Sequence, residues 1–112
     1  MAGGRDRMTE VDYGTKVKNM LTNYKDKETQ VKIFETIDEE HIFLGHCISC
    51  LESYEKDLIT NILIEKISIR RYARKTGFSR SFITKERDRL IFLLAKFFRI
   101  RYSYSEQIRC AG

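Results

Sequence analysis

A run of cationic and hydroxyl side chains between residues 68 and 89 is the part of this sequence best suited to binding an anionic partner. Arg, Lys, Ser and Thr side chains bond phosphate oxygens, and Arg and Lys also reach the edges of guanine bases. Residues 66–102 carry 12 Lys and Arg against 2 Asp and Glu, whereas residues 1–65 carry 8 against 13. A polyanion is therefore attracted to the second part of the chain and repelled by the first.

Two helices joined by a tight turn are expected to present these side chains. Ser68 and Ser79 predict the two helix starts, because a serine hydroxyl accepts a hydrogen bond from a free amide of the first turn. Gly77 lies between them and tolerates the left-handed backbone of a tight helix exit. Ala73 offers a small residue at the closest approach, and Ile83 offers an apolar anchor on the second helix. This spacing predicts a helix-turn-helix.

The predicted second helix is the candidate for the DNA major groove, and the first helix is the candidate for the flanking backbone. The base-reading candidates are Arg80, Ser81, Thr84, Lys85 and Asp88. The candidates for phosphate contacts are Arg70, Arg71, Arg74, Lys75, Ser79, Arg87 and Arg89. We expect the phosphate contacts to set affinity and its salt dependence, and the base contacts to set sequence preference. Double-stranded DNA is the predicted partner.

The rest of the chain also favours helices, because it lacks proline and shows no long alternation of apolar and polar residues. The predicted fold class is all-α, a helical domain with a C-terminal helix-turn-helix. The predicted divisions are a disordered N-terminus at 1–8, a helical region at 9–50, the helix-turn-helix region at 51–102 and a flexible tail at 103–112.

Local signals place the N-terminal helices. Thr9 and Asp38 are predicted helix caps, and Ser53 is expected to open a later helix. Residues 25–27, with the sequence Lys-Asp-Lys, predict a polar break. The helix capped by Asp38 is expected to carry Ile42, Leu44, Cys47, Ile48 and Leu51 as its apolar members, and Gly45 within it weakens its continuity. The short segment after the break carries an apolar stripe formed by Val31, Ile33, Phe34 and Ile37.

The last predicted helix is more apolar than one buried face requires. Phe97 extends the stripe of Leu90 and Leu94 and is expected in the core. Phe92, Leu93 and Phe98 then widen the apolar surface, and surplus of this kind often marks an interface. A homodimer, formed by the last helix or by the N-terminal helices, is the predicted use. The acidic first half could instead meet a basic surface on RNA polymerase.

The stretch from about Leu51 to Phe98 resembles region 4 of bacterial sigma factors. The matching segments are 51–56, 67–69 with Ala73, and 77–81, and segment 90–98 is similar to the last helix of the narrower group named next. More narrowly, it is similar to the RinA and ArpU group of phage and prophage late-gene regulators. The resemblance implies a small cytoplasmic activator that binds promoter or late-operon DNA. Glu86 and Arg87 stand where an aliphatic residue is usual, and Tyr72 where a smaller one is common. Lys75 and Thr76 replace the apolar pair that often precedes the glycine. These departures predict either looser helix pairing or a second protein surface that covers this site.

Two other functions use the same module. The first is a protein that binds RNA polymerase or a sigma factor without specific DNA readout. The second is an accessory protein of DNA packaging or recombination, of the small terminase type, which would assemble into a ring. Each is separable from the leading interpretation by its partner or its mass in solution.

His41, His46, Cys47 and Cys50 lie close together in the sequence and include types that bind zinc. All four fall on one predicted helix, whereas structural zinc sites usually draw ligands from two segments, so we predict no metal and no cofactor. Cys110 in the tail is expected to be an exposed free thiol. No nucleophile–base arrangement or phosphate-binding glycine loop is present, so an enzyme is not expected. No segment is apolar enough to span a bilayer, and a cytoplasmic location is predicted.

Overall fold

The computed structural model describes the backbone of residues 10–111 and the side chains of residues 12–103. These residues form helices and no strand, which confirms the all-α prediction for this part of the chain. The helices are α2 (Glu10–Thr22), α3 (Tyr24–Phe34), α4 (Glu39–Ser49), α5 (Ser53–Ile59), the π-helical turn η1 (Thr60–Ile64), α6 (Ile69–Thr76) and α7 (Arg80–Ala111). Segment 1–8, the predicted Thr9 cap and the side chain of Cys110 lie outside the described residues.

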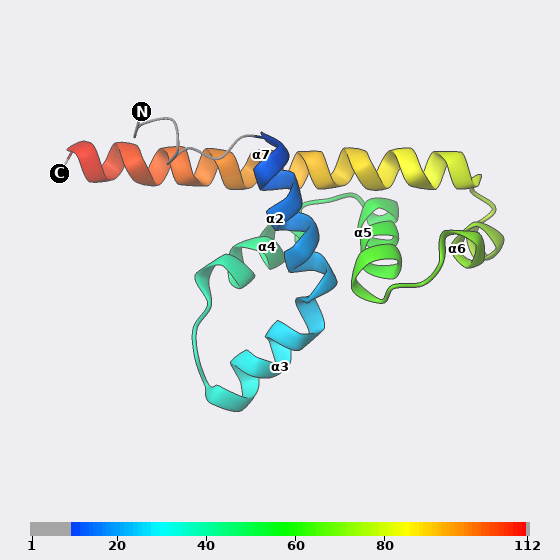
Figure 1. Ribbon diagram of the computed structural model, residues 1–112, viewed down its shortest axis with the longest axis horizontal. Helices are drawn as coiled ribbons and strands as arrows, with labels where there is room; N and C mark the ends of the chain where they lie inside the picture. Colours follow the sequence, from blue (N-terminus) through cyan, green and yellow to red (C-terminus); the bar gives the residue numbers. More distant parts are fainter. Residues whose placement is uncertain (1–9, 112) are drawn as a thin grey trace.

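The long helix α7 is the scaffold on which the other helices are assembled (Figure 1). Its 32 residues correspond to a length of about 48 Å at the usual rise per residue. The longest dimension of the molecule is 52 Å. α2 crosses α7 near its middle, and α5 and α6 lie under its N-terminal half. α7 continues to Ala111, past the boundary that the sequence predicted at residue 102.

The core follows one stripe of α7. Ile83, Leu90, Leu94 and Phe98 recur at helical spacing and are fully buried. They meet apolar side chains that the shorter helices bury against them: Val17, Leu21, Leu44, Leu58, Ile59 and Tyr72. Because every shorter helix except α3 contributes at least one buried residue, the core is continuous from α2 to α6.

The C-terminal part of this stripe differs from the sequence expectation. Phe98, expected as surplus surface, is fully buried, and its ring packs edge-on against Phe43 with centroids 4.9 Å apart. Phe97 is only partly buried. Phe98 is the buried residue of the two because it lies four residues after Leu94, on the same side of the helix as Leu90 and Leu94. Phe92 remains 52% exposed, as expected for surplus apolar surface.

Most local signals lie where the structure has helix ends. The Asp38 side chain accepts a hydrogen bond from the His41 amide at 3.0 Å, which confirms this cap. α4 is continuous through Gly45, as the helix predicted after Asp38 requires. The break between the first two helices is at Asn23, not at residues 25–27. The Asn23 side chain donates to the Asn19 carbonyl at 2.9 Å and so competes with regular helix bonding.

The broad apolar face predicted after Ser53 extends over α5 and the π-helical turn that follows it. α5 begins with Glu52 as its cap and passes directly into η1, whose π-helical geometry widens the turn. In this geometry Leu58, Ile59, Ile62 and Leu63 are all buried.

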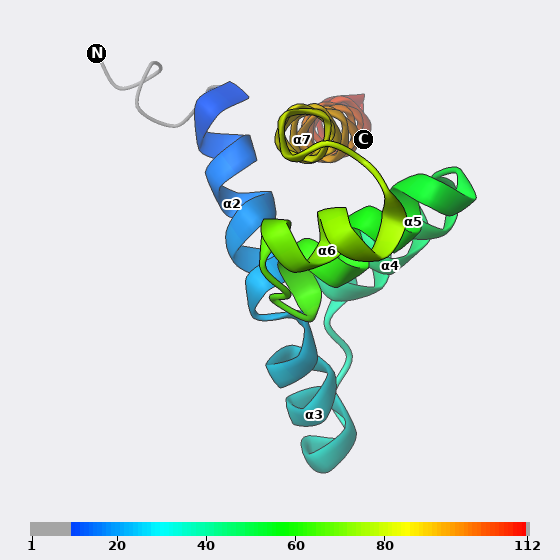
Figure 2. The ribbon, with the colours of Figure 1, turned by 90° about the vertical axis from the view of Figure 1, so that its right-hand side faces the viewer.

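α3 and the loop after it, residues 24–38, form a projection that we call the arm. It extends away from α7 and α6 in both views (Figures 1 and 2). Its base is fixed to α4 by an ion pair between Lys27 and Asp38 at 3.1 Å and by the rings of Tyr24 and His41, 4.5 Å apart. α3 itself buries no residue. Among the described helices, none has the length and apolar character to cross a membrane.

Candidate nucleic-acid interface

A three-residue turn joins α6 to α7, and side chains fix both helix starts. Ser68 Oγ accepts from the Arg71 amide at 3.1 Å, and Ser79 Oγ accepts from the Phe82 amide at 3.0 Å. Gly77 ends α6 with a φ of 86°, and its amide donates to the Ala73 carbonyl at 2.8 Å. A side chain at this φ would be strained, so glycine allows the sharp change of direction.

α6 and α7 cross steeply after this turn. α7 lies horizontally in Figure 1 while α6 is seen nearly end-on, and in Figure 2 α7 is end-on and α6 is seen from the side. Ile83 is fully buried, and Ala73 packs against the core at the edge of the crossing. The two serine caps and the glycine exit are therefore at the residues that the spacing predicted.

Six exposed cations lie on α6 and the first turns of α7, and we call this set the basic face. It consists of Arg70, Arg71, Arg74, Lys75, Arg80 and Lys85. On α6 the cations recur at positions i, i+1, i+4 and i+5, which places them on one side of the helix. Within the described residues none of the six has an ion pair or a side-chain hydrogen bond. Their charge is available to a partner.

Most of the remaining candidates for DNA contact already have a hydrogen-bond or ion-pair partner within the protein. Ser81 is exposed, whereas the Thr84 hydroxyl donates to the Arg80 carbonyl at 3.0 Å. Arg87 pairs with its neighbour Asp88 at 3.1 Å. The Ser79 hydroxyl serves as the cap of α7. Arg89 points into a polar network between helices and is separate from the basic face.

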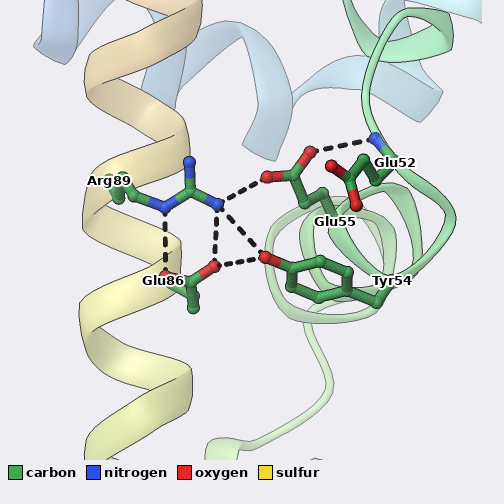
Figure 3. A network of polar contacts seen from close by, with 5 residues as sticks. All are labelled: Glu52, Tyr54, Glu55, Glu86 and Arg89. Carbon is green, nitrogen blue, oxygen red and sulfur yellow. Dashed lines mark hydrogen bonds and ion pairs between the residues drawn. The ribbon is translucent and has the colours of Figure 1, made fainter.

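That network connects α7 to α5 (Figure 3). The Arg89 guanidinium donates to Glu55 on α5 and to Glu86 on α7, the latter at 2.8 Å. Tyr54 donates to Glu86 at 3.1 Å, and the Glu52 amide donates to Glu55 at 2.9 Å. Glu86, one of the two charged residues noted at the expected aliphatic position, is thus hydrogen-bonded within this network. Its polar contacts join α5 to α7, and the expectation of looser pairing between the two helices of the turn stays a prediction.

The ionisation of these groups is shifted by the same contacts. The hydrogen bond from Arg89 lowers the pKa of Glu55, and the Glu52 amide lowers it further. The hydrogen bond from Arg89 also lowers the pKa of Glu86. Both carboxylates are thus held in the charged form, and the attachment of α5 to the start of α7 depends on that charge.

Tyr72 is a second polar attachment under the basic face. Its ring is buried, and its hydroxyl donates to Asp57 of α5 at 2.6 Å. Burial and this bond raise the pKa of Tyr72 well above its usual range, so the hydroxyl stays protonated and remains a donor. The large side chain that departs from the sigma pattern is therefore used to fix α6 on α5.

Sequence reasoning did not include Lys66 among the candidates. It is exposed in the loop before α6, has a left-handed backbone with a φ of 60°, and has no ion pair with another described residue. The sequence feature that could have added Lys66 to the phosphate candidates is its position two residues before the Ser68 cap, at the edge of the segment rich in Lys and Arg.

The histidine and cysteine residues of α4 do not converge. No group of three potential metal-binding side chains occurs among the described residues. Cys47 is buried in the core and Cys50 is exposed. Burial raises the pKa of Cys47 to about 11, which keeps its thiol protonated. The His41 ring packs against the ring of Tyr24, so His41 contributes to the packing of α4 on α3.

Compared with known proteins, the chain matches no protein-family model, no curated protein and no solved structure. The resemblance to region 4 of sigma factors therefore stays a prediction based on the residues quoted for it.

Proposed function

We propose that this protein binds duplex DNA through the basic face and regulates transcription as a sigma-like activator of the phage and prophage type. The observation that carries the proposal is the set of six exposed, unpaired cations on two steeply crossed helices. In the N-terminal half Lys16, Lys25 and Lys27 pair with carboxylates, whereas Lys18, Lys32 and Lys56 have no ion pair among the described residues. Those three are spread over different helices, while the six cations of the basic face lie between residues 70 and 85.

In the proposed complex the start of α7 lies in the major groove, which is wide enough for an α-helix. Arg80 and Lys85 face base edges or nearby phosphates, and the exposed Ser81 lies between them in sequence. The Phe82 amide already donates to the Ser79 hydroxyl. The amides before it have no partner within the helix and can hold a phosphate oxygen. The cations of α6 then follow the adjacent backbone, as in other helix-turn-helix complexes.

Fluorescence anisotropy with labelled duplexes at several salt concentrations tests the proposal. Affinity should fall steeply with salt, because each neutralised phosphate releases counterions. Replacing Arg70 or Arg74 with Gln should weaken binding to all duplexes and reduce the slope of log K against log salt by about one. Lys18→Gln is the matched control, since Lys18 is exposed on α2 and unpaired among the described residues.

Sequence preference is tested separately by selecting bound duplexes from a random pool. Lys85→Gln should relax the selected sequence, with a loss of roughly 1–3 kcal/mol per specific contact. Salt-independent binding, or no binding at low salt, contradicts the proposal. Tight binding to RNA polymerase in the absence of DNA binding would support the interaction-protein alternative.

A further inference from the structure

Asp88 is the one exposed acid of the cation-rich segment 66–102, whose side chains the structure describes throughout. The other acid of this segment is Glu86, whose side chain is 14% exposed and is held by Arg89 and Tyr54. The Asp88 side chain is 64% exposed. An exposed carboxylate on a surface that binds a polyanion repels phosphate and lowers the affinity for every duplex. A contact that a carboxylate makes with one particular base would offset this loss.

The position of Asp88 on α7 groups it with the side chains proposed for the major groove. Lys85 and Ser81 precede it by three and seven residues, so the three share one side of the helix. Asp88 is two residues before the buried Leu90. Lys85 and Ser81 are each two residues from the buried Ile83. Two residues turn an α-helix by about 200°, so this exposed side lies opposite the core.

Arg87 holds one oxygen of the Asp88 carboxylate and leaves the other free. Arg87 Nε donates to Asp88 Oδ1 at 3.1 Å, and a second nitrogen of the same guanidinium lies 3.1 Å from that oxygen. Asp88 Oδ2 has no hydrogen-bond or ion-pair partner among the described residues. This exposed pair contributes little to stability, but it orients the carboxylate and offsets part of its charge. The protein therefore offers one oriented acceptor on the outer side of α7.

The base edges of the major groove differ in what they offer to a carboxylate. Cytosine presents the N4 amine, which is a donor, and no acceptor beside it. Adenine presents the N6 amine next to the N7 acceptor, and guanine presents two acceptors, which repel a carboxylate oxygen. Thymine presents an acceptor and a methyl group. A carboxylate therefore favours cytosine, whereas an amide, which both donates and accepts, favours adenine.

We propose, on the basis of the DNA binding proposed above, that Asp88 reads a cytosine in the major groove by accepting a hydrogen bond from its N4 amine. Lys85 lies about 4.5 Å before Asp88 along the helix axis. This distance is close to the spacing of about 3.4 Å between successive base pairs. A guanine contacted by Lys85 then lies within about two base pairs of the cytosine. The preferred duplex carries the two bases at neighbouring positions.

Selection of bound duplexes from a random pool, followed by anisotropy titration of the selected duplex, tests this contact. The unmodified protein should select a cytosine whose replacement lowers affinity by roughly tenfold. Asp88→Asn should select adenine at the same position, because an amide forms two hydrogen bonds with N6 and N7. Asp88→Ala should select no base there. Both variants should bind unrelated duplexes more tightly at low salt, since a repulsive charge is removed.

Asp26→Asn is the matched control, because it removes an exposed carboxylate on α3, in the arm, that has no ion pair among the described residues. It should leave the selected sequence unchanged, and circular dichroism confirms that each variant is folded. A selected site without this cytosine, or one that Asp88→Asn leaves unchanged, overturns the proposed role of Asp88 but not the binding of DNA. Absence of salt-dependent binding by the unmodified protein overturns both.

Discussion

Arg89 joins two helices by donating to one carboxylate on each. Arg89→Met should lower the free energy of unfolding by about 1–2 kcal/mol, because Glu55, at 8% exposure, loses the donor that offsets its burial. The loss stays modest since the Arg89 side chain is partly solvated. Urea denaturation measures the effect. Arg74→Met is the matched control and should change stability by less than about 0.5 kcal/mol.

The same network predicts how stability depends on pH. The pKa values of Glu55 and Glu86 are lowered in the folded protein, so the network contributes fully above the ordinary glutamate pKa of about 4.3. Its contribution is lost as the pH falls through the lowered values. The stability difference between the unmodified protein and Arg89→Met should therefore be largest at neutral pH and shrink in acid. A difference that stays constant down to about pH 3 would contradict this account.

Tyr72 gives a prediction that separates a hydrogen bond from packing. Tyr72→Phe removes only the hydroxyl that donates to Asp57 and should cost about 1–2 kcal/mol. Tyr72→Ala also removes the buried ring and should cost about 3–5 kcal/mol. Both values come from urea denaturation. Equal costs for the two variants would mean that the ring contributes little to the attachment of α6.

At the scale of helices and turns, Gly77 and Gly14 predict opposite responses to the same change. A Cβ added at either glycine meets no atom within 4 Å, so sterics do not decide the result. Gly77→Ala places alanine at a φ of 86° and should destabilise by about 1–2 kcal/mol. Gly14→Ala, within α2, should stabilise by roughly 0.5–1 kcal/mol. Thermal denaturation gives both signs, and a stabilising Gly77→Ala would mean that the turn tolerates another conformation.

The elements that the sequence predicts well are those with a local cause. The Ser68 and Asp38 caps and the Gly77 exit depend on interactions within four residues, so the residue types alone indicate them. The basic face follows from the same helical spacing. The exposed side chains of α6 could therefore be placed before the structure was known.

The elements that the sequence predicts poorly depend on contacts between distant residues. Arg89 was expected to contact phosphate, but Glu55, 34 positions earlier, holds its guanidinium. The turn η1 and the burial of Phe98 depend on how α7 packs against the other helices. The exposure of Ile33 could not be predicted from the sequence either, because a stripe of apolar residues does not indicate whether another helix covers it.

At the scale of the whole molecule, the central position of α7 determines which parts of the backbone can open locally. Since α2, α4, α5 and α6 all rest on this helix, its middle can unwind only when the whole core is lost. In deuterium labelling, the backbone amides near Leu90 and Leu94 should exchange last and report the global unfolding equilibrium. Those of α3 should exchange early, as a separate unit that opens while the rest of the protein stays intact.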